Sequence, residues 1–79
     1  MIEVISMKVT QELIKKGLAR FTVLFPIPEH SNKPEIVSIW YDLFHDMDAE
    51  VFTAACAQCE ANLTAFPLPA DVNRFAAKL

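Results

Sequence analysis

The sequence predicts an all-α fold, a small orthogonal or antiparallel bundle of three main helices followed by a short C-terminal helix. Apolar residues recur at helical spacing in four stretches, and no clean run alternates apolar and polar residues as strands do. Glycine occurs once and proline five times among 79 residues. With 53% apolar residues, the chain can bury one core. We therefore expect a single helical domain over residues 1–79, with residues 1–7 as a flexible or extended lead.

The central helix is expected over residues 34–47. An apolar stripe with the spacing i, i+3, i+4, i+7, i+8, i+11 runs along it and consists of Ile36, Ile39, Trp40, Leu43, Phe44 and Met47. Aromatic side chains bury the largest areas, so we expect Trp40, the only tryptophan, at the centre of the core. Asn32 and Glu35 match a capping box, and Pro34 suits a first helical turn.

The first helix is expected over residues 8–24, with Thr10 or Ser6 as its cap, and it ends before Pro26. Gly17 lies inside this helix, where glycine costs about 1 kcal/mol relative to alanine. We expect Gly17 to allow the close approach of a neighbour such as the Trp40 ring.

The third helix is expected over residues 49–63, with Asp48 as its N-cap and a buried face that includes Phe52 and several small residues. A very short link joins it to the central helix, which predicts that the two form an antiparallel hairpin. A last helix, over residues 69–79, begins at Pro69.

Composition and motifs argue against several classes of function. The net charge of −3 lacks the basic character of most nucleic-acid-binding domains. No apolar run approaches the roughly 20 residues of a membrane span, and the first residues do not form a signal peptide. No nucleophile–base pair or glycine-rich phosphate loop occurs. We therefore expect a cytoplasmic protein that is not an enzyme, with no catalytic residue, metal or cofactor and with reduced cysteines.

Cys56 and Cys59 form a C-x-x-C pair, which His30 and His45 could complete as a zinc site. Both cysteines lie in the middle of a predicted helix on its apolar face, however, whereas zinc ligands of this kind usually lie on a turn. We favour the interpretation that the two thiols pack in the core as small apolar groups.

Charged residues gather around the turn between the second and third helices. The acidic corner, as we name it, consists of Asp42, His45, Asp46, Asp48 and Glu50. It is the first candidate for a partner-binding surface, because such a cluster can steer a basic partner. The competing interpretation is that Asp48 and Glu50 cap the third helix while Asp42 and Asp46 are simply solvated.

A second candidate surface is basic and comprises Lys8, Lys15, Lys16 and Arg20 of the first helix. These residues could contact DNA, but no aromatic residues are interleaved with them and the chain is acidic overall. A solvated helix face is the favoured interpretation.

Several motifs resemble a known family in their order along the chain. They are Phe25-Pro26, then Trp40-Tyr41-Asp42-Leu43-Phe44, then Asp46-Met47-Asp48 before an alanine-rich helix, and last Phe66-Pro67-Leu68-Pro69-Ala70-Asp71-Val72. This order resembles the small phage proteins that load and inhibit replicative DNA helicases, and more loosely the phage replication proteins that load the host helicase. The likeness covers about residues 10–76.

The resemblance implies an all-α adaptor that binds a hexameric helicase and holds it inactive until delivery at an origin. It implies no cofactor, and we expect a monomer. The matching positions expected in the core are Trp40, Leu43, Phe44, Phe66 and Val72. Two other functions remain open, namely a helical nucleic-acid-binding or regulatory protein that uses the basic residues, and a structural or assembly protein of a phage particle.

Overall fold

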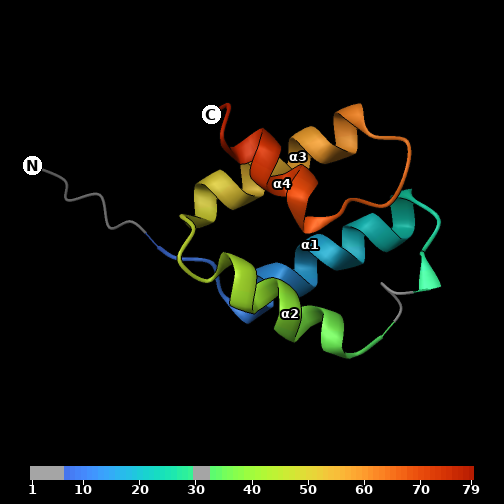
Figure 1. Ribbon diagram of the computed structural model, residues 1–79, viewed down its shortest axis with the longest axis horizontal. Helices are drawn as coiled ribbons and strands as arrows, with labels where there is room; N and C mark the ends of the chain where they lie inside the picture. The colour runs from blue at the N-terminus through green and yellow to red at the C-terminus, as the bar shows by residue number, and fades with distance from the viewer. Residues whose placement is uncertain (1–6, 30–32) are drawn as a thin grey trace, which may run out of the picture.

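The computed structural model describes residues 7–29 and 33–79 (Figure 1). These residues form the four helices α1 (Gln11–Leu24), α2 (Glu35–Phe44), α3 (Ala49–Asn62) and α4 (Pro69–Ala76). The predicted all-α fold, with three main helices and a short C-terminal one, is confirmed. Three predicted roles, a cap at Ser6, a cap at Asn32 and a zinc ligand at His30, lie outside the described residues. None of the described helices has the length and hydropathy that crossing a membrane requires.

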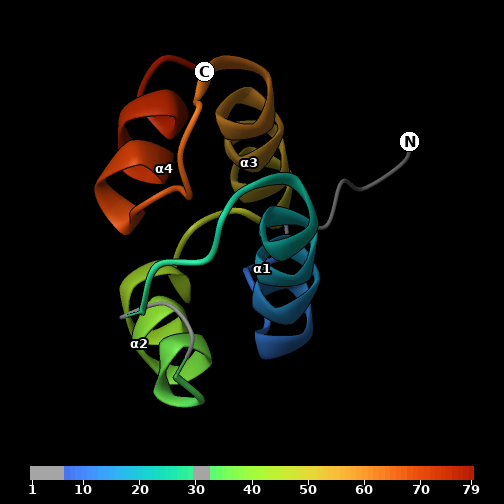
Figure 2. The same cartoon turned by 90° about the vertical axis from the view of Figure 1, so that its right-hand side faces the viewer.

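The buried side chains come from all four helices, from the segment before α1 and from the two loops that contain Phe25 and Phe66, and they form one cluster. Figure 2 shows α1 and α3 along one side of the molecule, and α2 and α4 along the other. The Phe21 ring lies 6.3 Å from Trp40 and 5.8 Å from Phe66, while Phe44 lies 5.5 Å from Trp40 and 5.3 Å from Phe52, measured between ring centroids. Trp40 is only 3% exposed, which confirms its predicted place in the core.

The start of α1 differs from the prediction. Thr10, one of the two residues predicted as the cap, is the N-cap of α1. Its Oγ1 accepts a hydrogen bond from the Leu13 N–H at 3.2 Å. Lys8 and Val9 precede the helix because the chain is extended there and pairs with the α2–α3 turn. The Val9 N–H donates to the Met47 carbonyl at 3.0 Å, and Lys8 forms an antiparallel bridge with Asp48. These backbone contacts hold residues 8 and 9 against the turn between α2 and α3.

Gly17 contacts a different neighbour from the one expected. A Cβ atom at Gly17 would lie 3.6 Å from Cε2 of Phe52 and 3.7 Å from Sγ of Cys56. The approaching helix is therefore α3, and the prediction that the Trp40 ring packs there is wrong. The physical reason is that α1 lies between two partners and turns a different face to each, so Trp40 meets α1 through Phe21 instead.

The predicted stripe of α2 is buried only in part. Trp40 and Phe44 are buried, but Ile39 is 55% exposed and Leu43 is 57% exposed, so their assignment to the core is wrong. Among the helices, α2 packs mainly against α1. A stripe of six apolar residues is wider than the face that one neighbouring helix covers. The side chains at the edge of the stripe consequently reach the surface.

The third helix confirms its predicted cap and its buried face but not its predicted partner. Asp48 accepts hydrogen bonds from the Glu50 N–H at 2.9 Å and the Val51 N–H at 3.3 Å. The buried residues on this helix are Phe52, Ala55, Cys56 and Cys59. The extensive packing of α3 is with α4 and α1, not with α2, so the predicted α2–α3 hairpin is wrong. Residues 45–48 redirect the chain instead of reversing it alongside α2.

The last helix is shorter than predicted. α4 begins at Pro69, and the Asp71 carboxylate accepts a hydrogen bond from the Leu68 N–H at 3.0 Å, which caps its first turn. Val72 is fully buried, whereas Leu79 lies beyond the helix and is 62% exposed. The helix thus closes the core mainly through Val72.

Candidate functional site

The structure divides the acidic corner into two parts with different roles. Asp48 and Glu50 belong to the start of α3, where the Asp48 carboxylate caps the helix and Glu50 lies in the first turn. A carboxylate in the first turn interacts favourably with the helix dipole. The competing interpretation of these two residues, that they serve the helix, therefore has direct support.

The other acidic residues lie on the outside of α2 and in the turn after it. Asp42 and Asp46 are both exposed, and neither is paired with a lysine or arginine among the described residues. His45, the C-cap of α2, places its Nδ1 3.4 Å from Oδ1 of Asp46. The imidazole would form an ion pair with this carboxylate only when it is protonated. Two carboxylates thus remain available to a basic partner.

Two large apolar side chains share this part of α2. The exposed Ile39, Asp42 and Leu43 follow the spacing i, i+3, i+4 and therefore lie on one side of α2, and the exposed Asp46 follows in the turn after it. We call these four residues the α2 outer surface. Ile39 and Leu43 were missed as functional candidates because the sequence assigns them to the core. The signal that could have identified them is the width of the apolar stripe.

The α2 outer surface continues towards the start of α4. A depression of about 270 Å³ next to it is lined by Lys33, Glu35, Ile36, Ile39, Trp40, Pro67, Leu68 and Pro69. Leu68, on its far wall, is 47% exposed. The combination of exposed aliphatic groups, a shallow depression and exposed carboxylates fits a protein segment that carries apolar and basic residues.

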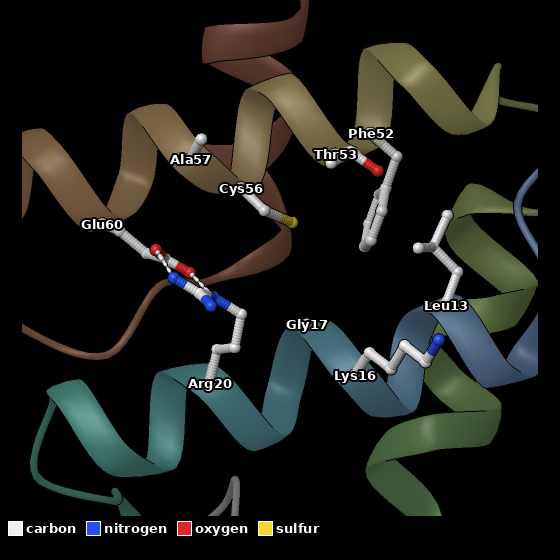
Figure 3. Close-up of a pocket in the computed structure, with 9 residues that line it drawn as sticks. All are labelled: Leu13, Lys16, Gly17, Arg20, Phe52, Thr53, Cys56, Ala57 and Glu60. Atoms are coloured by element: carbon white, nitrogen blue, oxygen red, sulfur yellow. Dashed lines mark hydrogen bonds and ion pairs between the residues drawn. The ribbon is translucent and has the colours of Figure 1, made fainter.

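The four basic candidates do not act as one free cationic surface. Arg20 is fork-bonded to Glu60 on α3, with its Nε and Nη2 atoms 2.8 Å and 2.9 Å from the two carboxylate oxygens (Figure 3). Lys15 lies 3.6 Å from Glu12 one turn earlier. Lys8 lies in the extended segment opposite Asp48, inside the acidic corner. Only Lys16 remains on α1 without an ion-pair partner among the described residues.

The two cysteines are buried free thiols in the middle of α3. Burial raises the pKa of Cys56 to about 12 and that of Cys59 to about 11, because the thiolate would lose its hydration. Across residues 7–29 and 33–79, no three histidine, cysteine or acidic side chains are grouped in a way that could hold a metal ion. The environment of the pair is that of core residues.

Comparison of the chain with known protein families, with curated proteins and with solved structures finds no match.

Proposed function

We propose that this chain is a protein-binding adaptor without catalytic activity, and that its partner is a replicative DNA helicase. In this role it takes part in the initiation of DNA replication in a bacterial cytoplasm, as a loader or an inhibitor of the helicase. The identity of the partner rests on the resemblance of the Trp40-Tyr41-Asp42-Leu43-Phe44 and Phe66-to-Val72 motifs to phage helicase loaders. Binding itself is supported by a separate feature of the molecule.

That feature is the exposure of Ile39 and Leu43, each more than half exposed, on the same side of α2. Contiguous apolar patches on the surface of a small protein are typical of sites where another molecule binds. Asp42 and Asp46, which lie among them, would favour a partner surface with lysine or arginine around an apolar centre. The carboxylates would speed the encounter, and the aliphatic groups would hold the complex together.

The proposal is tested with the replicative helicase encoded in the same genome or in that of its host. The helicase hexamer is immobilised, and binding of the wild-type chain is compared with that of Ile39→Ala/Leu43→Ala by interferometry. We expect the double variant to bind at least about tenfold more weakly, equal to about 1.4 kcal/mol. Val23→Ala is the matched control, because Val23 lies on α1 instead of α2 and is 84% exposed.

The acidic half of the surface has its own test. Charge reversal at Asp42 and Asp46 should slow association and flatten its dependence on salt, while changing the stability by no more than about 0.5 kcal/mol. If the wild-type chain shows no affinity for the helicase, the proposed partner is wrong. If it binds and both sets of variants bind equally well, the partner stands and the α2 outer surface is not the interface.

A further inference from the structure

We propose that the groove between α1 and α3 binds a second copy of this chain, so that the protein forms a weak two-fold symmetric dimer. This groove lies on the side of the molecule formed by α1 and α3, whereas the α2 outer surface belongs to the helix pair on the other side (Figure 2). The dimer would therefore leave the α2 outer surface free for a different partner. It is a property beyond the proposed adaptor function and replaces the monomer that the sequence alone led us to expect.

The groove consists of two adjoining depressions that share Leu13, Thr53 and Ala57. One, of about 330 Å³, lies over Gly17, Phe52 and Cys56, and the other, of about 380 Å³, extends past Ala54 to the start of α3. Figure 3 shows the first of them, with α1 and α3 as its two walls and the Arg20–Glu60 pair across one end. The groove thus follows α3 for most of its length and α1 from Leu13 to Arg20.

The walls of the groove are low, which allows helices of another molecule to come close. Gly17 on α1 and Ala54 and Ala57 on α3 have little or no side chain, and the exposed Thr53 is short. The distance between packed helices is set by the side chains at their contact, and small residues permit the shortest separations. A contact of this kind would cover the half-buried Leu13 and the exposed Thr53.

The charges around the groove identify a second copy as the occupant. Its lining carries two cations, Lys16 and Arg20, and two carboxylates, Glu50 and Glu60, which sum to zero. The whole chain carries −3, and the α2 outer surface carries only acidic charge. Two copies that met through α2 would repel each other, whereas two copies that meet through the groove present both signs to one another.

Two-fold symmetry makes use of this balance. In such a dimer the same patch is used twice, so a contact from one residue to a second is repeated in the reverse direction. Lys16 and Glu50 have no ion-pair partner among the described residues of their own chain, so each is available to the opposite charge on the other copy. The patch is therefore complementary to itself.

The size of the patch limits the affinity. Both helices have 14 residues, which gives a length of about 21 Å and a joint width of about 20 Å. This face is roughly half of the 800 Å² that each partner contributes to a standard stable interface. We therefore expect a dissociation constant of about 10–100 µM.

Sedimentation equilibrium of the full chain tests this proposal, over concentrations from about tenfold below to tenfold above that range. The average mass should rise with concentration from 8.9 kDa towards twice that value. Ala57→Glu, at an exposed position on the α3 wall of the groove, should abolish the rise. Ala70→Glu adds the same charge at an exposed position on α4, outside the groove and outside α1 and α3, and should dimerise like the wild type.

A second variant tests whether the loss of the dimer in Ala57→Glu results only from added negative charge or from misfolding. Thr53→Lys places a cation in the groove and should also weaken the dimer at least tenfold, while circular dichroism confirms an unchanged helix content. A wild-type chain that remains at 8.9 kDa at every concentration would overturn the proposal. So would a dimer that Ala57→Glu leaves intact, since it would have to use another face.

Discussion

Gly17 packs beside Phe52 and Cys56 without using the absence of its own side chain. A Cβ atom there would meet these neighbours at 3.6–3.9 Å, which is ordinary van der Waals contact. Alanine would also remove the conformational penalty of glycine in a helix, so Gly17→Ala should stabilise the protein by about 0.5–1 kcal/mol. Urea denaturation measures this difference.

A larger side chain at the same position is the control for this expectation. Gly17→Leu would push against the Phe52 ring and should destabilise the protein. A loss of stability in Gly17→Ala itself would mean that α1 and α3 lie closer together than described here.

The stability of the fold depends on pH through the ion pair between Glu60 and Arg20. The hydrogen bonds from Arg20 lower the pKa of Glu60 below its ordinary value of 4.5. A carboxylate with a depressed folded-state pKa stabilises the fold above its unfolded pKa, and this contribution is lost as the pH falls through the folded-state pKa. Glu60→Gln should thus have a lower melting temperature than the wild type at pH 7, and the difference should shrink below pH 4.5. A difference independent of pH would show that the ion pair contributes nothing.

At the scale of the element, small side chains make up most of the buried face of α3, and the two cysteines belong to that face. Both thiol pKa values, about 12 and about 11, lie far above neutral pH, so very little thiolate forms. Alkylation of Cys56 and Cys59 by iodoacetamide at pH 8 should be at least about 100-fold slower in the folded protein than in denaturant. Mass spectrometry follows the reaction, and equal rates in both conditions would contradict the buried packing.

The helices differ in how well sequence patterns predict them. The sequence predicted the N-caps correctly, because a single residue determines a cap. Thr10 and Asp48 both accept the expected backbone hydrogen bonds. The start of α1 was less predictable, because residues 7–9 pair with residues about 40 positions further along the chain. Helical periodicity cannot report a contact of that separation.

The α2 helix illustrates a further limit of such patterns. Periodicity identified the correct side of α2 at Trp40 and Phe44, but it could not reveal how many neighbours would cover that side. Since α2 packs mainly on α1, Ile39 and Leu43 remain exposed. The acidic part of the candidate site was therefore predictable from the sequence, whereas its apolar part required the tertiary arrangement.

At the scale of the whole molecule, stability is concentrated in one cluster of aromatic rings around Phe21, Trp40 and Phe44. Removal of the Trp40 ring should cost about 3–5 kcal/mol, which is close to the total of about 5–15 kcal/mol that holds a small domain together. Trp40→Ala should therefore be largely unfolded or melt at a much lower temperature. A variant that melts like the wild type would remove Trp40 from the centre of the fold.

The molecule presents two apolar regions with different electrostatics. The α2 outer surface is acidic, and the α1–α3 groove is balanced in charge. The first suits a basic partner protein and the second suits another copy of the chain. The first of these proposals depends on a fold in which α2 buries only one part of its apolar stripe.

The free energy of unfolding of Leu43→Ala tests that dependence most directly, because it requires no partner. Leu43 is 57% exposed, and alanine favours the helix, so we expect a loss smaller than about 1 kcal/mol in urea denaturation. A leucine buried in the core, as the sequence pattern suggested, would instead cost about 2–5 kcal/mol. A loss in that higher range would contradict the account, because Leu43 would then belong to the core and the α2 outer surface would not exist.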